Sequence, residues 1–210
     1  MGIFPRDCMR RGADYNKGNK KGGRKREHAR NAGGILVPPV RNSYGSYIFR
    51  GDVRMRVIHS IAPVYDANSK ILILGSFPSV KSRESKFFYG HPQNRFWRVI
   101  AAVCGCKTPE TITEKKEMLL LNNIALWDVI ESCDIEGSSD SSIRNVRVND
   151  FSRIFAAADI QQIFANGGTA YNLYKKHVGD NITRLPSTSP ANAAWNQERL
   201  IDAWRVILNR

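Results

Sequence analysis

Residues 71–75 read Ile-Leu-Ile-Leu-Gly, and this short apolar run is the stretch that decides the fold class. Four consecutive aliphatic side chains ended by a glycine are typical of a strand that is covered on both faces, as the strands of parallel sheets are. Similar apolar runs predict further strands at 124–130, 160–165 and 182–185. The sequence therefore predicts four buried strands.

Apolar residues with helical spacing fill the intervals between these strands. Asn94 is a suitable capping residue for the first helix of this pattern, and the last helix carries a continuous apolar stripe. The predicted helices cover residues 94–103, 114–121, 151–158, 169–177 and 200–208. Strands that alternate with helices form a parallel sheet with right-handed crossovers and helices on both faces, so we predict an α/β fold of this kind.

The segments that follow the four predicted strands are rich in glycine, proline, serine and asparagine. They begin GSFPS at residue 75, ESCDIEGSSDSS at 131, NGGTAYN at 166 and PSTSPAN at 186. Parallel strands bring their carboxyl ends to one edge of a sheet, and ligands bind beyond that edge. We therefore predict that the functional site lies there.

The loop after the first strand carries three consecutive aromatic residues at 87–89, followed by His91 and Asn94. Aromatic rings beside amide and imidazole groups can stack on a planar ring and hydrogen-bond its edge, which is how proteins hold a single unpaired base. Glycine and proline near Tyr89 favour a place for it in the site. The other two aromatic residues of the trio have the core as an alternative, and for the aromatic pair at 96–97 the core is favoured.

Three polar features near this edge have both a functional and a structural interpretation. Asp128 interrupts an apolar run, either as a site residue or as half of a buried pair, because a buried carboxylate needs partners. His91 is a candidate acid or base, or a structural hydrogen-bonding group. The hydroxyl groups at 186–190 can bind phosphate oxygens, although an ordinary turn has the same composition. Nearby basic residues that could also contact phosphates are Arg83, Lys86, Arg95 and Arg98.

The chain carries 32 Lys+Arg against 19 Asp+Glu, and its formal net charge of +13 favours a polyanionic partner. Residues 1–54 hold nine of these net charges and nine of the 16 glycines, without helical or strand periodicity. We interpret them as a disordered basic arm that attracts phosphate without sequence specificity, or as a non-native extension. The folded domain is expected at 55–210.

Other sequence features argue against several classes of protein. No apolar run approaches the roughly 20 residues of a membrane helix, and four cysteines are too few for a disulfide scaffold, which favours a cytoplasmic location. The C-x-C pair at 104–106 lacks the cysteine and histidine partners of a zinc site. Neither a P-loop nor a G-x-G-x-x-G motif is present. We therefore expect no metal and no cofactor.

Five segments of the chain together resemble the uracil-DNA glycosylase superfamily and, within it, the hypoxanthine-DNA glycosylases. They are ILILGSFPSVKSRE (71–84), FFYGHPQNRFW (87–97), IALWDVIESCDIEGSSDSSIRN (124–145), NGGTAYNLY (166–174) and LPSTSPANA (185–193). The resemblance implies a three-layer α/β/α sandwich around a central four-stranded parallel sheet, with a catalytic domain at about 55–210. It also implies hydrolysis of the N-glycosidic bond of a deaminated base (hypoxanthine, uracil or xanthine) in double- or single-stranded DNA, without metal or cofactor.

The resemblance and the residues of the rim together give roles to single residues. Asn94 matches the catalytic asparagine of the hypoxanthine branch. The expected base-binding residues are Phe77, Phe88, Tyr89, His91, Asp128 and Asn166, and the expected phosphate-binding residues are Ser76, Ser79, Ser187 and Ser189. Two positions depart from the superfamily's pattern. Phe77 stands where its best-known members have Asp or Asn to hold a water, and Leu185 stands where many have histidine.

We expect the damaged nucleotide to swing out of the duplex into this site, at a cost of roughly a few kcal/mol that is smallest for a mispaired base. An asparagine amide takes up no proton near neutral pH, so Asn94 can only orient a water and stabilise charge, and most of the rate must come from electrostatic preorganisation. The expected protein is a monomeric enzyme of base excision repair. The alternative is a catalytically silent nucleic-acid-binding module on the same fold, whereas a small-molecule hydrolase lacks its G-x-S-x-G motif.

Overall fold

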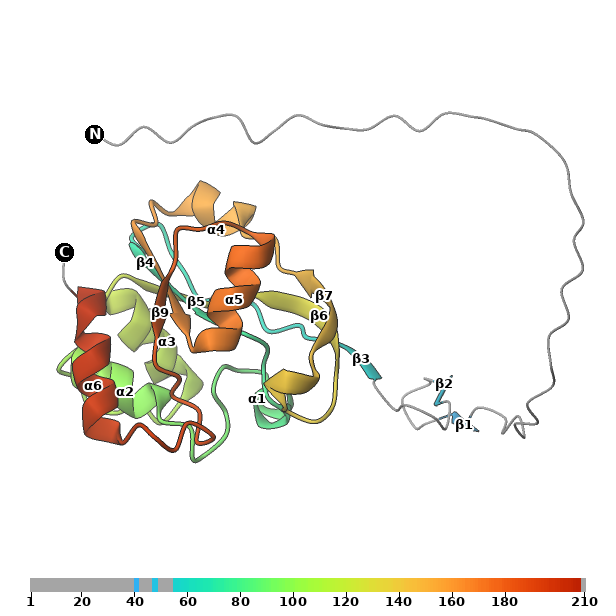
Figure 1. The fold of residues 1–210 in the computed structure, drawn as a ribbon. Coiled ribbons are helices and arrows are strands. Elements are labelled where there is room, and N and C mark those ends of the chain that lie inside the picture. Colours follow the sequence, from blue (N-terminus) through green and yellow to red (C-terminus); the bar gives the residue numbers. More distant parts are fainter. Residues whose placement is uncertain (1–39, 42–46, 49–54, 209–210) are drawn as a thin grey trace, which may run out of the picture. The chain divides into compact units, whose positions relative to one another are not determined.

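The computed structural model of the chain describes residues 40–41, 47–48 and 55–208 (Figure 1). The first two pairs of residues are short strands, β1 (Val40–Arg41) and β2 (Tyr47–Ile48), which pair with each other in antiparallel orientation. Apart from these four residues, the predicted basic arm at 1–54 lies outside the described residues. The boundary between an arm and a domain at residue 55 therefore stays a prediction.

Four parallel strands form the central sheet, in the order β5-β4-β8-β9. Their bounds are Ile71–Gly75 for β4, Ile124–Asp128 for β5, Gln162–Asn166 for β8 and Thr183–Leu185 for β9. All three neighbouring pairs are parallel, so the predicted sheet is confirmed. β4 and β5 are buried along their whole length, which explains why their sequences are almost continuously apolar.

The order of the strands places a topological switch point at β4. From β4 the chain passes to β5 on one side of the sheet, and it then returns to form β8 and β9 on the other side. In open α/β sheets, ligands bind beyond the carboxyl ends of the strands at such a point. The topology therefore indicates a site beyond the ends of β4 and β8.

Helices cover both faces of the sheet, which confirms the α/β/α layers. The helices are α1 (Val80–Ser85), α2 (Phe96–Val103), α3 (Ile112–Leu121), α4 (Ser152–Ala157), α5 (Gly168–His177) and α6 (Gln197–Trp204), and the 3-10 turns are η1 (Asp140–Ser142) and η2 (Arg205–Leu208). Figure 1 shows α2, α3 and α6 to one side of the strands and α5 to the other. Each predicted helix is present, and α1 adds a helix in a segment that was expected to be a loop.

Capping side chains explain where three of these helices begin. Ser79, Thr111 and Asn196 each accept a hydrogen bond from the backbone N–H three residues further on, which satisfies one of the unpaired amides of a helix start. The expected cap of α2 works differently. Asn94 Oδ1 accepts from the N–H of Phe96 at 3.0 Å, one position ahead of the capping residue Arg95.

A second, antiparallel sheet corrects the sequence prediction. It contains β3 (Met55–Ile58), β6 (Ile130–Ile135) and β7 (Arg144–Val148), with β6 in the middle. The single strand predicted at 124–130 is wrong, because β5 ends at Asp128 and β6 begins two residues later. Polar residues after Ile130 suggest a loop, but an antiparallel strand needs to bury only part of its side chains.

Aromatic side chains fill the core beneath the carboxyl edge of the parallel sheet. Phe96 and Trp204 are fully buried, and Trp97 is nearly so, which confirms the core assignment of the pair at 96–97. The ring of Phe96 meets Trp97 and Trp204 edge-on, with centroids 5.0 and 5.8 Å away. Trp204 Nε1 also donates to the carbonyl of Pro186 at 3.0 Å. The core thereby anchors the loop that follows β9.

Candidate active site

A cavity of about 870 Å³ opens at the carboxyl edge of the parallel sheet. Its wall includes the last residue of each of the four strands: Gly75, Asp128, Asn166 and Leu185. The loops that follow these strands complete the wall, because the parallel arrangement brings all four to one edge. The polar loop residues that the sequence placed on one rim therefore surround a single cavity.

Ten of the eleven residues expected in the site line this cavity. They are Ser76, Phe77, Ser79, Phe88, Tyr89, Asn94, Asp128, Asn166, Ser187 and Ser189. The exception is His91, which is absent from the cavity wall. Its Nδ1 accepts a hydrogen bond from the N–H of Gln93 at 3.2 Å, and its carbonyl accepts from the N–H of Asn94 at 2.9 Å. The geometry therefore favours the structural interpretation of His91, as a residue that shapes the turn ahead of Asn94.

A chain of hydrogen bonds joins Asn94 to Asn166 through Thr188, which is fully buried. Asn166 holds Thr188 with both ends of its amide: Nδ2 donates to Thr188 Oγ1, and Oδ1 accepts from the backbone N–H, both at 2.9 Å. Thr188 Oγ1 then donates to Asn94 Oδ1 at 3.0 Å. Since Asn94 Oδ1 also accepts from the N–H of Phe96, the amide orientation of Asn94 is determined. Its Nδ2 is the end with no partner among the described residues.

Arg95 binds the loop after β9 with its guanidinium group. Its guanidinium group donates to the carbonyl oxygens of Thr188, Ser189, Asn192 and Trp195, and its backbone N–H donates to Thr188 as well. Five donors of one residue thus bind four carbonyls of a neighbouring loop. The expectation that Arg95 contacts phosphates is not supported by this geometry, because four of its five guanidinium donors are already engaged.

Tyr89 occupies an unusual backbone conformation that directs its hydroxyl into the cavity. Its φ of 52° lies in the left-handed region, which costs a non-glycine residue roughly 1 kcal/mol or more. Stacking on Phe96, with ring centroids 3.9 Å apart and an interplanar angle of 24°, holds the ring in place. The hydroxyl oxygen is shielded from solvent and forms no hydrogen bond of ordinary geometry with the described residues. Burial raises the pKa of Tyr89 above its usual value, the charge of Asp128 adds to the rise, and Asn166 opposes it.

Asp128 is enclosed in the cavity wall. Its side chain is 3% exposed, and Oδ2 has no hydrogen-bond partner in the described part of the chain. Of the two interpretations of Asp128, the geometry favours the site residue over half of a buried pair. Burial raises the pKa of Asp128 to about 7, and the charge of Asp140 contributes in the same direction. Asn149 donates to the backbone carbonyl of Asp128 at 2.8 Å and fixes the strand end from which the side chain projects.

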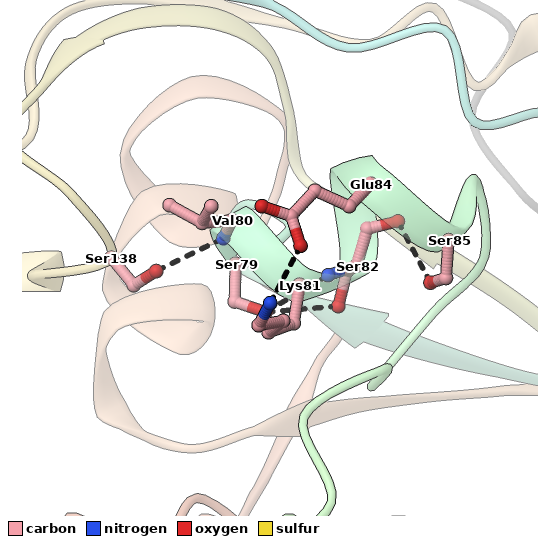
Figure 2. A network of polar contacts seen from close by, with 7 residues as sticks. All are labelled: Ser79, Val80, Lys81, Ser82, Glu84, Ser85 and Ser138. Carbon is pink, nitrogen blue, oxygen red and sulfur yellow. Dashed lines mark hydrogen bonds and ion pairs between the residues drawn. The ribbon is translucent and has the colours of Figure 1, made fainter.

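The serines of the first loop are engaged within the protein. Ser76 Oγ donates to the carboxylate of Asp140, with both oxygens at 3.1 Å, so a phosphate at this hydroxyl would meet a negative charge. Ser79 caps α1, and its Oγ lies 3.0 Å from that of Ser82 (Figure 2). The first N–H of α1 is likewise bound by Ser138 Oγ. The geometry therefore gives little support to a phosphate-binding role for Ser76 and Ser79.

The serine hydroxyl groups of the last loop are acceptors and donate to no residue in the described part of the chain. Ser187 Oγ accepts from the N–H of Ser189 at 3.2 Å, and Ser189 Oγ accepts from the N–H of Ala191 at 3.3 Å. Each hydroxyl is thus an acceptor in the loop, and its own proton can be donated to a ligand. Phosphate oxygens accept such donors, so these two residues suit the role expected of them.

Arg184 lines the cavity and is absent from the predicted site. It is exposed in the middle of β9 and forms no ion pair with any of the described residues. Its guanidinium nitrogen Nη2 comes within 3.1 Å of the position that a Cβ on Gly168 would take. In the sequence, the position of Arg184 two residues before Pro186 could have marked it as a site residue. A strand of only three residues, however, does not show on which side of the sheet a side chain lies.

The described residues show neither a cluster of metal ligands nor a membrane-spanning helix. Among the residues that the structure describes, no three His, Cys, Asp or Glu side chains gather to hold a metal ion. No helix in residues 55–208 is long and apolar enough to cross a membrane. A cytoplasmic location stays a prediction.

The fold and the cavity define an α/β protein whose parallel sheet carries an aromatic- and amide-lined pocket at its carboxyl edge. The family model of the uracil DNA glycosylase superfamily matches residues 62–208, and the chain belongs to this superfamily.

Similar proteins come from two species of Methanosarcina. The chain is 38% identical over 140 residues to a protein of Methanosarcina acetivorans named hypoxanthine DNA glycosylase, a match that covers 65% of this chain and 89% of the relative. A protein of the same name from Methanosarcina barkeri is 34% identical over 134 residues, with 62% and 85% covered. The solution NMR structure of a candidate uracil DNA glycosylase from Methanosarcina acetivorans matches with a TM-score of 0.63 and 33% identity, over 74% of this chain and 98% of that one.

Proposed function

We propose that this protein excises deaminated bases from DNA, hypoxanthine foremost and uracil or xanthine in addition, by hydrolysing the N-glycosidic bond as a step of base excision repair. Membership of the superfamily and the names of the two Methanosarcina relatives support the class of enzyme, a DNA glycosylase. The observation that carries the proposal is the convergence of Asn94, Asn166, Asp128 and the aromatic residues on one cavity. That the enzyme acts as a monomer stays a prediction.

The cavity suits a base that has left the DNA stack. Enzymes that act on a base in a duplex extrude it into a pocket and read its edge with hydrogen bonds between aromatic walls. The nearly buried ring of Phe88 and the ring of Tyr89 belong to the wall, and Phe77 lines it too. The shielded oxygens of Tyr89 and Asp128, which lack partners within the described residues, are available to the edge of such a base.

Asn94 is the proposed catalytic residue. The expected role of orienting a water would rest on Oδ1, but that oxygen already accepts two hydrogen bonds. We therefore favour Nδ2 as the working group, a donor to the base as negative charge develops on it during bond cleavage. Preorganised donors of this kind stabilise a transition state without rearranging, because Thr188 and Phe96 hold the amide in one orientation.

The decisive experiment uses the full chain and DNA duplexes that carry one deoxyinosine, deoxyuridine or deoxyxanthosine. Abasic sites are cleaved with alkali after incubation, and strand breaks are measured by gel electrophoresis. We expect breaks at the lesion, most rapidly at deoxyinosine, and none in the unmodified duplex. The same lesions in single strands should also be cut, since the base is already free to enter the cavity. Binding without breaks on any lesion would refute the proposal and favour a silent binding module.

Arg184 is the proposed contact to a phosphate beside the extruded nucleotide, together with the hydroxyl protons of Ser187 and Ser189. We expect Arg184→Ala to weaken binding of duplexes with and without a lesion alike. The slope of log K against log salt should become shallower by about one, because one fewer phosphate is neutralised. Fluorescence anisotropy across a salt series measures both quantities.

A matched control for Arg184→Ala removes the same charge elsewhere. Lys107 is exposed, pairs only loosely with Glu110 at 3.8 Å and is not part of the cavity wall. Lys107→Ala should therefore leave the salt slope unchanged. Equal effects of the two substitutions would show that overall charge, and not a contact at Arg184, controls binding.

A further inference from the structure

We propose that Asp128 binds the extruded base as a neutral carboxylic acid, donating a hydrogen bond to the carbonyl oxygen that deamination places on the base. This inference rests on the proposed function and names the chemical form of one residue in that same site. Asp128 is protonated when it binds the base, so the binding of deaminated bases depends on pH.

The surroundings of Asp128 carry this inference. The side chain is 97% buried at the end of β5, in the wall of the cavity, and Oδ2 is shielded from solvent without a hydrogen-bond partner among the described residues. An ionised carboxylate in such a place would lose its hydration and gain nothing in return. The neutral acid avoids that cost and carries a proton that can be donated.

Of the polar groups near Asp128, only Asp140 opposes its ionisation by charge, and the others are neutral. Tyr89 lies in the loop after α1, and its hydroxyl is neutral. A Cβ added at Gly75 of β4 would meet both this hydroxyl and Asp128 Oδ1, so the two groups lie near the same residue. Asp140, from η1, lines the same cavity and adds a negative charge. Asn166, from β8, is neutral, and no lysine or arginine of the described residues pairs with Asp128. Burial and Asp140 together raise the pKa of Asp128 to about 7.

The two protonation states favour different bases. A neutral carboxyl group can donate to a carbonyl oxygen, which hypoxanthine, uracil and xanthine all carry after loss of an amino group. An ionised carboxylate is only an acceptor, so it repels that oxygen and favours an amino group instead. Ionisation of Asp128 should therefore weaken binding of deaminated bases, and the effect should appear as pH rises through the pKa of this residue.

The test compares the full-length protein with Asp128→Asn between pH 5.5 and 8.5, on a deoxyinosine duplex under single-turnover conditions. An asparagine amide has the shape of the neutral acid and keeps an N–H donor at every pH in this range. We expect the unmodified protein to lose about tenfold in rate for each pH unit above the midpoint. Asp128→Asn should cleave within about tenfold of it at pH 6, show no such decline, and exceed it at pH 8.5.

Asp140→Asn is the second variant and gives a readout that a purely structural role would not change. Asparagine can still accept from Ser76, but the negative charge is gone. Since that charge raises the pKa of Asp128, its removal should shift the midpoint of the decline to lower pH. An unshifted midpoint would contradict the proposal.

Two results would overturn the inference. One is an Asp128→Asn protein that is folded by circular dichroism but cleaves at no pH. The other is a rate that rises with pH in the unmodified protein only, since either shows that the carboxylate is the active form. If the unmodified protein cleaves no lesion at any pH, the proposed function fails instead. Binding of free hypoxanthine, measured by calorimetry against pH in both proteins, then tests Asp128 by itself.

Discussion

Replacing Asn94 by alanine is expected to lower the single-turnover rate on a deoxyinosine duplex by about 10²–10³-fold, the usual cost of removing one preorganised donor. The affinity for the duplex should change little, because Asn94 lies in the cavity wall and the proposed phosphate contacts lie in β9 and the loop after it. Quenched-flow or manual single-turnover cleavage, with binding measured separately, distinguishes the two effects.

Two variants sharpen this experiment. Asn94→Asp keeps an oxygen that accepts from Phe96 and Thr188, but it replaces the Nδ2 donor with a second acceptor. It should be as slow as Asn94→Ala if donation to the leaving base is the role, and nearly as fast as the unmodified protein if Asn94 only supports the loop. Gln93→Ala changes the exposed neighbour, which is absent from the cavity wall, and should be fully active. A substantially active Asn94→Ala protein would refute the mechanism.

Gly75→Ala is expected to abolish measurable cleavage and to destabilise the domain by about 1–3 kcal/mol, the usual cost of overpacking a core. A Cβ at this position would overlap Asp128 Oδ1 and lie 3.1 Å from Tyr89 Oη. Both residues would have to move, although burial and the stack on Phe96 hold them. Thermal unfolding and the deoxyinosine assay measure the two losses.

Gly179→Ala provides the matched control, because a Cβ there meets no atom within 4 Å and the backbone does not need positive φ. Its melting temperature and activity should equal those of the unmodified protein. In the double variant with Asp128→Ala, the clash at Gly75 is relieved, so stability should recover while activity stays low. A Gly75→Ala protein with normal stability and normal activity would show that the strand ends adjust freely.

The sequence was sufficient to predict the parallel sheet and the edge where its site lies. The apolar run at 71–75 has no interpretation other than a buried segment, and its alternation with helical periodicity implies parallel neighbours. Because parallel strands run in one direction, every loop that follows a strand lies at the same edge of the sheet. This prediction requires no knowledge of side-chain contacts. The rim residues and the resemblance to known motifs together supplied Asn94 and nine other residues that line the cavity.

Features that depend on contacts between distant segments could not be predicted. Residues 130–135 become a strand because β3 and β7 pair with them, a tertiary effect that overrides their polar composition. Arg95 and Arg184 are both arginines beside a candidate site, yet one binds four carbonyls and the other forms no ion pair with the described residues. Whether Asp128 has a partner likewise depends on what packs above the end of β5.

The contacts of Arg95 have a consequence for the time course of folding. They join positions 93 to 100 residues apart in the chain, and contacts of such long range form after local structure during folding. A nascent chain that has emerged only as far as β8 can begin to pair its first three parallel strands, but Asn94 still lacks the loop that orients it. We therefore expect catalytic competence to appear among the last events of synthesis and folding, well after most of the secondary structure.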